Sequence, residues 1–171
     1  MNIHKKYIHL ALAGLYLGTT ISIAGAEPVN INITGKVIAS PCVVASGSNI
    51  NVNLGDIPAA DIAVAGTTST PVNFTINLAS CPVGTTSVVV TFTGTEDPDF
   101  PVRYKNSGTA NVAIELIQVS TGYLKGNNTN ITQSVLADRT VTYNLRAQAY
   151  SKGNVTPGTI FGIVQANFTY N

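Results

Sequence analysis

Two histidines and two cysteines are the residues of this chain most suited to act as nucleophiles, bases or metal ligands: His4, His9, Cys42 and Cys81. Both histidines lie in an N-terminal segment that we expect to be removed on export. Without them, neither a Ser-His-Asp nor a Cys-His arrangement can be assembled. A metal site built on two thiolates would need further ligands, whereas an even and minimal cysteine count in an exported chain is typical of one disulfide. We expect a Cys42–Cys81 bond, no metal and no cofactor.

The carboxylates suggest two other kinds of chemistry. Glu96, Asp97 and Asp99 form one acidic cluster, but its spacing is not that of an EF-hand calcium loop and no glycine stands at its turn. A solvated loop is expected there instead. Paired carboxylates for glycoside hydrolysis would have to come from acids that no local motif marks, namely Asp56, Asp61, Glu115 and Asp138. The sequence predicts that the protein is not an enzyme and has no small-molecule substrate.

The N-terminus has the organisation of a secretory signal peptide, residues 1–26. Lys5 and Lys6 precede a nearly uncharged apolar run, Tyr7–Ile23, which closes on the small residues Ala24-Gly25-Ala26. A transmembrane anchor is the alternative, but the run is slightly short for a span and no charged stop-transfer cluster follows it. Removing 26 of the 171 residues leaves 145, which is enough for one domain with a sizeable core.

The expected mature chain is nearly neutral. All eight acidic residues remain, against seven of the nine basic ones, because Lys5 and Lys6 leave with the signal peptide. No run or patch of Lys and Arg is present, which argues against a nucleic-acid partner. No amphipathic basic helix indicates binding to a membrane surface.

The mature sequence reads as an all-β domain. It is rich in Thr, Val, Asn, Ile and Gly, and it lacks the sustained 3.6-residue period of amphipathic helices. Short alternating runs bounded by turn residues predict an antiparallel β-sandwich, with no linker and no second domain. The predicted strands are Val29–Ala39, Asn49–Leu54, Val72–Leu78, Ser87–Thr93, Val112–Ser120, Thr140–Tyr150 and Thr159–Tyr170.

Both ends of the mature chain alternate strongly. One face of the N-terminal run carries Val29, Ile31, Ile33, Gly35 and Val37. One face of the C-terminal run carries Ile160, Gly162, Val164, Ala166, Phe168 and Tyr170. Either these two runs close a single sandwich within one molecule, or one of them supplies a strand to a neighbouring molecule. Composition alone slightly favours the first interpretation, because most terminal strands stay within their own domain.

Several short motifs follow one another along the mature chain: Ile33-Thr34-Gly35-Lys36-Val37, Pro41-Cys42, Val52-Asn53-Leu54-Gly55-Asp56, Ala79-Ser80-Cys81-Pro82-Val83-Gly84-Thr85, Phe92-Thr93-Gly94, Tyr104-Lys105-Asn106, and Gly158 with the penultimate Tyr170. In this order and spacing they resemble the subunits of type 1-like fimbriae assembled by the chaperone–usher pathway. The likeness spans the mature chain and is greatest to the small single-domain minor subunits of the fimbrial tip.

The resemblance implies a pilin fold, which is an immunoglobulin-like β-sandwich lacking its final strand and completed by a donor strand from another chain. In this family a periplasmic chaperone supplies that strand first, and the N-terminal extension of the next subunit then replaces it. Residues 27–39 would be the donor extension and residues 40–171 the pilin domain. Four groove-filling side chains are implied, with a Gly where the backbone approaches closely: Val29, Ile31, Ile33, Val37 and Gly35.

At the other terminus, the resemblance implies a strand that the chaperone recognises and that later borders the groove. Its residues would be Gly158, Ile160, Val164, Phe168 and Tyr170, with the Asn171 carboxylate held by basic chaperone residues. The implied partners are the periplasmic chaperone, an outer-membrane usher and neighbouring fimbrial subunits. The implied location is a cell-surface fimbrium, reached through the periplasm.

Several functions compete on this basis. The preferred one is a structural or adaptor subunit that joins a tip adhesin to the pilus shaft. A major shaft subunit is the alternative, although the local resemblance through Cys81-Pro82-Val83-Gly84-Thr85 favours a minor subunit. A tip adhesin usually carries an additional N-terminal lectin domain, and the pilin pattern begins too soon after the predicted cleavage site to leave room for one. A self-complete secreted β-sandwich binding module would be a stable monomer, whereas a pilin needs a partner.

Overall fold

The computed structural model describes residues 27–38 and 40–171. The predicted signal peptide, residues 1–26, and Ala39 lie outside the described residues, so cleavage after Ala26 stays a prediction. No helix within the described ranges is long and apolar enough to cross a membrane. The chain divides into an N-terminal unit that ends at Lys36 and a folded unit, Val37–Asn171.

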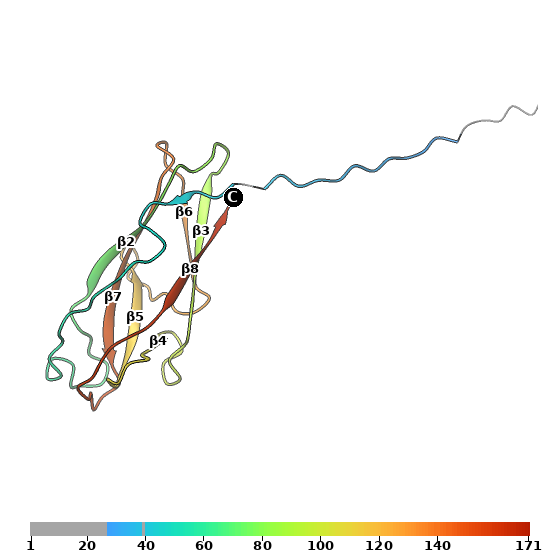
Figure 1. The fold of residues 1–171 in the computed structure, drawn as a ribbon. Coiled ribbons are helices and arrows are strands. Elements are labelled where there is room, and N and C mark those ends of the chain that lie inside the picture. Colours follow the sequence, from blue (N-terminus) through green and yellow to red (C-terminus); the bar gives the residue numbers. More distant parts are fainter. Residues whose placement is uncertain (1–26, 39) are drawn as a thin grey trace, which may run out of the picture. The chain divides into compact units, whose positions relative to one another are not determined.

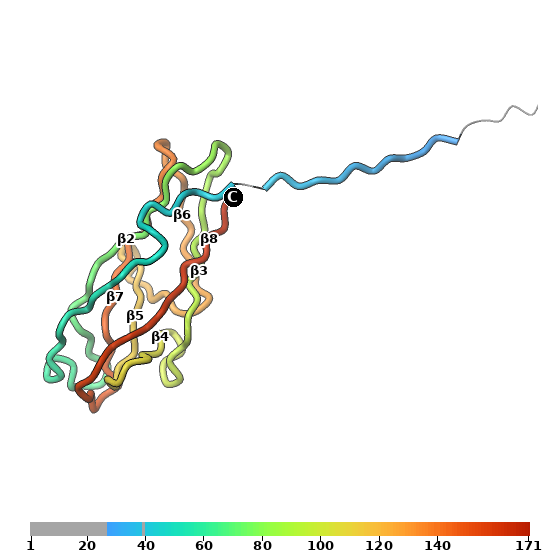
Figure 2. The backbone as a smooth tube through the Cα atoms, viewed as in Figure 1, coloured from blue at the N-terminus to red at the C-terminus, as the bar shows by residue number. Residues whose placement is uncertain are grey.

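The folded unit consists of two antiparallel sheets (Figure 1). The larger sheet has the strand order β1-β2-β7-β5-β4: β1 (Val43–Val44), β2 (Val72–Ala79), β7 (Val141–Ser151), β5 (Val112–Gln118) and β4 (Tyr104–Lys105). The smaller sheet has the order β6-β3-β8: β6 (Asn130–Ser134), β3 (Ser87–Gly94) and β8 (Val164–Tyr170). Figure 2 traces the chain as it crosses repeatedly between the two sheets.

Alternation along the strands fills the space between the sheets. From β3, Val88 and Phe92 are buried, and from β7, Tyr143 and Leu145 are buried, all in one apolar cluster. The Tyr143 hydroxyl donates a hydrogen bond to the Val88 carbonyl oxygen at 2.7 Å and so links the two sheets across the core. These side chains are aromatic or branched, which suits a pleated and half-buried surface. The prediction of an all-β antiparallel sandwich is confirmed.

Four of the predicted strands are confirmed with boundaries shifted by one or two residues: β2, β3, β5 and β7. The predicted strand Thr159–Tyr170 is right only in its second half, because β8 begins at Val164. The prediction missed β1, β4 and β6. Two of these have only two residues each, and such short strands carry no recognisable period.

Two predicted strands are wrong for the chain by itself. Asn49–Leu54 and residues 29–38 of the predicted N-terminal strand adopt no strand conformation. Both alternate as strands do, but a strand also needs a neighbour for its backbone N–H and C=O groups. The alternation is therefore present in both segments, and the ladder that would make them strands is not formed among the described residues.

Cys42 and Cys81 form the predicted disulfide. Both side chains are buried in the main apolar cluster, and the Cys81 N–H donates to the Arg139 carbonyl oxygen at 3.1 Å. The bond joins the residue before β1 to the chain just beyond β2. It therefore ties the first part of the folded unit to the core.

The acidic cluster is only in part the solvated loop that the sequence predicts: Glu96 and Asp99 are exposed, but Asp97 is buried. Asp97 is only 1% exposed, and its Oδ1 accepts the N–H groups of Asp99 and Phe100 at 3.0 and 3.2 Å. Its Oδ2 lies 2.6 Å from Lys152 Nζ, and the two groups form an ion pair. The prediction failed because Lys152 is far away in the sequence and only the fold brings it to Asp97.

The same loop covers the outer face of the larger sheet. Arg103 Nε donates to Glu115 Oε1 at 2.7 Å, and its guanidinium carbon lies 3.6 Å from the centre of the Tyr150 ring. Gln148 donates to the other oxygen of Glu115 at 2.6 Å. Glu115 is thus occupied by a cation and an amide. No group of three or more His, Cys, Asp or Glu side chains in the described part of the chain is placed to hold a metal ion.

The disulfide gives a first prediction. Replacing Cys42 and Cys81 with Ala should lower the free energy of unfolding by about 4 kcal/mol, because the bond closes a long loop in the unfolded chain. Guanidinium unfolding of the mature chain followed by circular dichroism measures the loss. Added reductant should destabilise the unmodified chain and leave the double variant unchanged. An unmodified chain that is indifferent to reductant would contradict the prediction.

Two buried tyrosines form a matched pair. The Tyr143 hydroxyl is bonded to Val88, whereas the Tyr104 hydroxyl is buried with no hydrogen-bond partner among the described residues. Tyr143→Phe should lower the free energy of unfolding by about 0.5–1.5 kcal/mol, because it removes a buried hydrogen bond. Tyr104→Phe should be neutral or stabilising, since it removes only an unpaired polar atom. Urea unfolding of both variants tests this, and equal losses would show that the contrast is wrong.

The same residues predict a loss of stability at alkaline pH. Burial raises the pKa of both hydroxyls above the ordinary value near 10, and at Tyr143 the nearby Tyr170 adds to the effect. The folded state therefore keeps these protons at a pH where the unfolded state has lost them. Their contribution to stability is complete below about pH 10 and falls as the pH rises further. Unfolding from pH 8 to 11.5 should show this decline, and the two Phe variants should show a shallower one.

Candidate functional site

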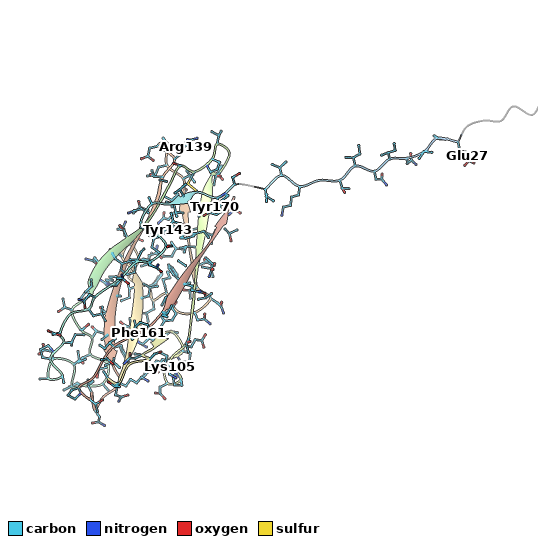
Figure 3. The ribbon with its side chains drawn as sticks, in the orientation of Figure 1. Glu27, Lys105, Arg139, Tyr143, Phe161 and Tyr170 are labelled. Carbon is cyan, nitrogen blue, oxygen red and sulfur yellow. A yellow bond between two sulfur atoms is a disulfide. The ribbon has the colours of Figure 1, made fainter. Side chains whose placement is uncertain are left out.

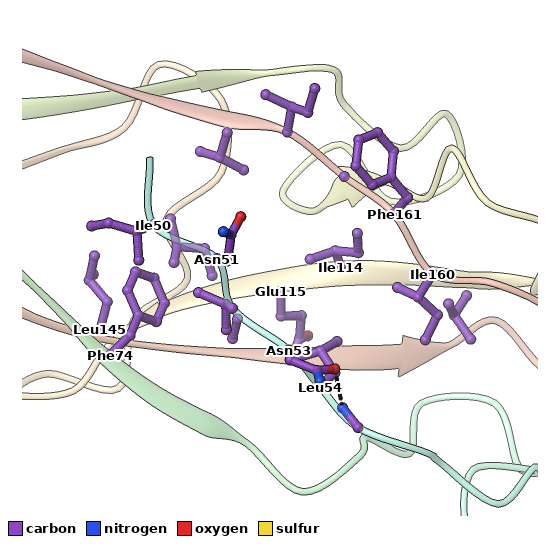
Figure 4. Close-up of a pocket in the computed structure, with 18 of the residues that line it drawn as sticks. Ile50, Asn51, Asn53, Leu54, Phe74, Ile114, Glu115, Leu145, Ile160 and Phe161 are labelled. Carbon is purple, nitrogen blue, oxygen red and sulfur yellow. Dashed lines mark hydrogen bonds between the residues drawn. The ribbon is translucent and has the colours of Figure 1, made fainter. Parts of the chain in front are cut away.

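An apolar groove of about 1390 Å³ opens along the folded unit. Its two walls are irregular or edge segments, residues 47–57 on one side and residues 155–168 on the other. Apolar side chains from both sheets form its floor: Phe74, Ile76, Phe92, Ile114, Leu116 and Leu145. In Figure 4, one segment carries Ile50 and Leu54, another carries Ile160 and Phe161, and Ile114 lies on the strand β5. A groove with this lining suits an extended apolar segment.

The β8 strand forms one wall and has an unpaired edge. It pairs with β3 and with no other strand in the described chain. Asn171 and Ser87 exchange N–H···O bonds in both directions, at 3.0 and 3.2 Å, which sets the phase of the ladder. In an antiparallel pair, alternate residues turn their backbone groups to opposite sides. The residues whose N–H and C=O groups face the open side are therefore Val164, Ala166, Phe168 and Tyr170.

The same four residues also point their side chains inward. They are half-buried, whereas the intervening Gln165, Asn167 and Thr169 are exposed. Apolar side chains and free backbone groups thus belong to one row of residues. An added strand would find hydrogen-bond partners and side-chain contacts along the same edge.

The opposite wall keeps the alternation of a strand without its ladder. Val52 and Leu54 are half-buried, and Asn51 and Asn53 are exposed. The Asn53 side chain accepts the N–H of Gly55 at 3.0 Å, which turns the chain at the end of this stretch. The inward and outward alternation of a strand is therefore present here, but the sequence did not indicate that this segment would border a groove.

The lower part of the groove reaches a second apolar cluster. Ile160 packs against this cluster, which contains Ile62, Ala110, Val112 and Ala149. Beside it, Gly158 allows a close approach of two backbones, since a Cβ at this position would lie 2.6 Å from the Ala110 nitrogen. The groove thus runs from the main core to a separate pocket-like end.

At the other end, the penultimate residue packs beside the core. Tyr170 is half-buried, and burial raises the pKa of its hydroxyl, an effect partly offset by a hydrogen bond with the Cys42 backbone. The rings of Phe168 and Tyr143 lie with centroids 6.2 Å apart. Figure 3 shows Tyr143 and Tyr170 at this end of the molecule. The Asn171 carboxyl oxygen accepts the N–H groups of Thr86 and Ser87 at 2.7 and 3.2 Å.

The residues expected to form the C-terminal edge are brought together as one continuous border. Gly158, Ile160, Val164 and Phe168 line the groove, and Tyr170 follows them in the same row. Sequence reasoning missed the floor residues Phe74 and Ile114 as parts of a site. Each lies in a correctly predicted strand, and no pattern within one strand says that its inner face remains uncovered.

The residues expected to fill a groove are themselves exposed. Val29, Ile31, Ile33 and Val37 are 84%, 80%, 92% and 100% exposed. Figure 3 shows the segment that starts at Glu27 as an extended chain with its side chains drawn as sticks. Four apolar side chains fully in water are costly for one segment to carry unless another surface covers them.

Comparison with known proteins identifies the family. The family model described as "Fimbrial protein" matches residues 31–171. The protein FimG of Escherichia coli strain K12 is 34% identical over 167 residues, which cover 92% of this chain and 96% of that protein.

Solved structures share the fold. The crystal structure of the P pilus rod subunit PapA superposes with a TM-score of 0.66 at 19% identity, covering 77% of this chain and all of that one. The P pilus adaptor subunit PapF gives a TM-score of 0.52, also at 19% identity, over 80% of this chain. These neighbours have the incomplete immunoglobulin-like sandwich of pilins, in agreement with the open edge of β8. The chain belongs to the fimbrial protein family and is a subunit of a chaperone–usher pilus.

Proposed function

We propose that this protein is a structural subunit that polymerises by donor-strand exchange, with residues 27–39 as the donor segment and the groove beside β8 as the acceptor. The observation that carries the proposal is the row Val164, Ala166, Phe168 and Tyr170, which combines inward apolar side chains with unpaired backbone groups. A strand from another chain is the ligand that satisfies both at once.

The energetics favour such a strand. Burying one Val or Ile side chain contributes roughly 1.5–3 kcal/mol, and the donor segment offers four of them. Each backbone hydrogen bond to the β8 edge adds about 0.5–1.5 kcal/mol. Together these gains oppose the entropy lost when an extended segment is ordered. On the opposite face of the donor segment, Asn30, Asn32, Thr34 and Lys36 would remain in water.

The free edge of β8 also suggests that its binding partners act in a fixed order. A free edge over an apolar groove is prone to unwanted pairing, so a newly exported subunit needs a temporary occupant. A periplasmic chaperone would fill this role and deliver the subunit to an outer-membrane usher, after signal-peptide removal at Ala26. The terminal Asn171 carboxylate, at the end of the edge strand, would be a charged anchor for basic chaperone residues.

Within the pilus we infer an adaptor role between the tip and the shaft. The motif Cys81-Pro82-Val83-Gly84-Thr85 supports it by its resemblance to the minor subunits. A major shaft subunit is the second candidate, since one structural neighbour is described as a rod subunit and another as an adaptor subunit. Both roles use the same groove.

The proposal predicts that a synthetic peptide of residues 29–39 stabilises the mature chain. At a peptide concentration 100 times its dissociation constant, the free energy of unfolding should rise by about 2.7 kcal/mol. Guanidinium unfolding with and without the peptide measures the change. A peptide carrying Ile31→Asp and Ile33→Asp should give no stabilisation, because burying carboxylates in an apolar groove is unfavourable.

The alternative function has a distinct result in the same experiment. If the chain is a stable monomer on its own and neither peptide changes its unfolding, donor-strand exchange is wrong. A self-complete β-sandwich binding module would then be the better description.

A further inference from the structure

The chain before β8 does not lie on the same sheet as β8 itself. Residues 164–170 pair with β3 of the smaller sheet. Just upstream, the chain bonds instead to the turn that follows β4 of the larger sheet: Ser107 N–H donates to the Phe161 carbonyl oxygen at 2.7 Å, and Ala110 N–H donates to that of Thr159 at 3.1 Å. The border of the groove therefore changes its supporting sheet near residue 163.

One side chain provides several of the hydrogen bonds that attach residues 159–161 to the turn after β4. Asn106 is 9% exposed, and its Nδ2 donates to the carbonyl oxygens of Ala110 and Thr159 at 2.8 and 3.2 Å. Its Oδ1 accepts the N–H groups of Gly108 and Phe161 at 2.9 and 2.8 Å. A primary amide has two N–H donors and one oxygen with two lone pairs, so Asn106 uses its full capacity. Figure 3 shows Phe161 beside Lys105, the residue that precedes Asn106.

These bonds have a consequence for the open edge. Thr159 and Phe161 turn their backbone groups toward the Asn106 turn, so the intervening Ile160 turns its own toward the opposite side. Farther along, Val164 and the alternate residues after it also face the open side. The even-numbered residues thus keep one phase from Ile160 to Tyr170 although the supporting sheet changes. Asn106 forms hydrogen bonds with the backbone groups of residues 159 and 161, as β3 does with those of the odd-numbered residues from 165 to 171.

We propose that Asn106 is a positioning residue for donor-strand binding, which holds the Ile160 end of the groove in phase with β8 so that one strand can bind along its whole length. The inference rests on the proposed function. Glycines at positions 108 and 158 are compatible with it, because a Cβ at either would collide with the facing chain. Asn106 itself does not touch the donor.

The test is a binding cycle on the full mature chain. Asn106→Ala and Asn106→Asp are compared with the unmodified chain for binding of a labelled peptide of residues 29–38, and of the same peptide with Val29→Ala or Val37→Ala. Asn111→Ala is the control, because Asn111 makes a single exposed hydrogen bond to the Gly153 carbonyl oxygen. Amide hydrogen exchange of Phe161 and of β8 is measured on each chain without peptide.

Asn106→Ala should weaken the unmodified peptide about tenfold or more, because the N–H groups of Gly108 and Phe161 lose their acceptor, and Asn111→Ala should leave it unchanged. Asn106→Asp should weaken it too, since its carboxylate lacks the two N–H donors. The loss of affinity caused by Asn106→Ala should differ between the two Ala peptides. It should be smaller for the peptide altered at the end that lies beside Ile160, and it should remain for the peptide altered at the opposite end. Exchange should quicken at Phe161 and stay slow in β8.

Two results overturn the inference while leaving the proposed function intact. One is an Asn106→Ala chain that binds all peptides as the unmodified chain does. The other is equal weakening of all three peptides with faster exchange throughout β8, which would indicate a general loss of stability. If the unmodified chain binds no peptide, the proposed function fails, and this inference fails with it.

Discussion

The architecture of this protein depends on one free strand edge, since the outward backbone groups of β8 have no partner strand among the described residues. Val164, Ala166, Phe168 and Tyr170 offer N–H and C=O groups sideways and apolar side chains inward. Ordinary domains cover such an edge with their own chain or blunt it with charges and bulges. Here an apolar groove lies beside it instead, and on the proposed function one strand from another chain would satisfy both the edge and the groove.

The rest of the folded unit holds that groove in shape. The Tyr143–Val88 hydrogen bond joins the two sheets through the core, and the Cys42–Cys81 disulfide ties the chain before β1 to the end of β2. On the outer face of the larger sheet, Arg103 is held between Glu115 and the Tyr150 ring. Packed interiors deform little, so these contacts keep the floor of the groove apart from its walls rather than letting them collapse together.

The strands that sequence reasoning predicted wrongly bear directly on function. Asn49–Leu54 and residues 29–38 have the alternation of strands and no ladder. One borders the groove, and the other carries exposed apolar side chains of the kind that a groove accepts. On the proposed function, this unfulfilled propensity for strand structure would be met by pairing with a second chain. The prediction for Asp97 failed for a different reason, since its burial depends on Lys152, which lies just after the distant strand β7.

The sequence by itself determined the all-β class, the disulfide, four of the central strands and the inward-facing row of the C-terminal strand. These features follow from local periodicity and residue type, which are visible within a short window. Only the tertiary structure decided that the row remains unpaired, that Phe74 and Ile114 form the floor of a groove, and that Asn106 bonds to Thr159 and Phe161. Each of these depends on which segments lie side by side, and pairing between residues some fifty positions apart leaves no mark on either segment alone.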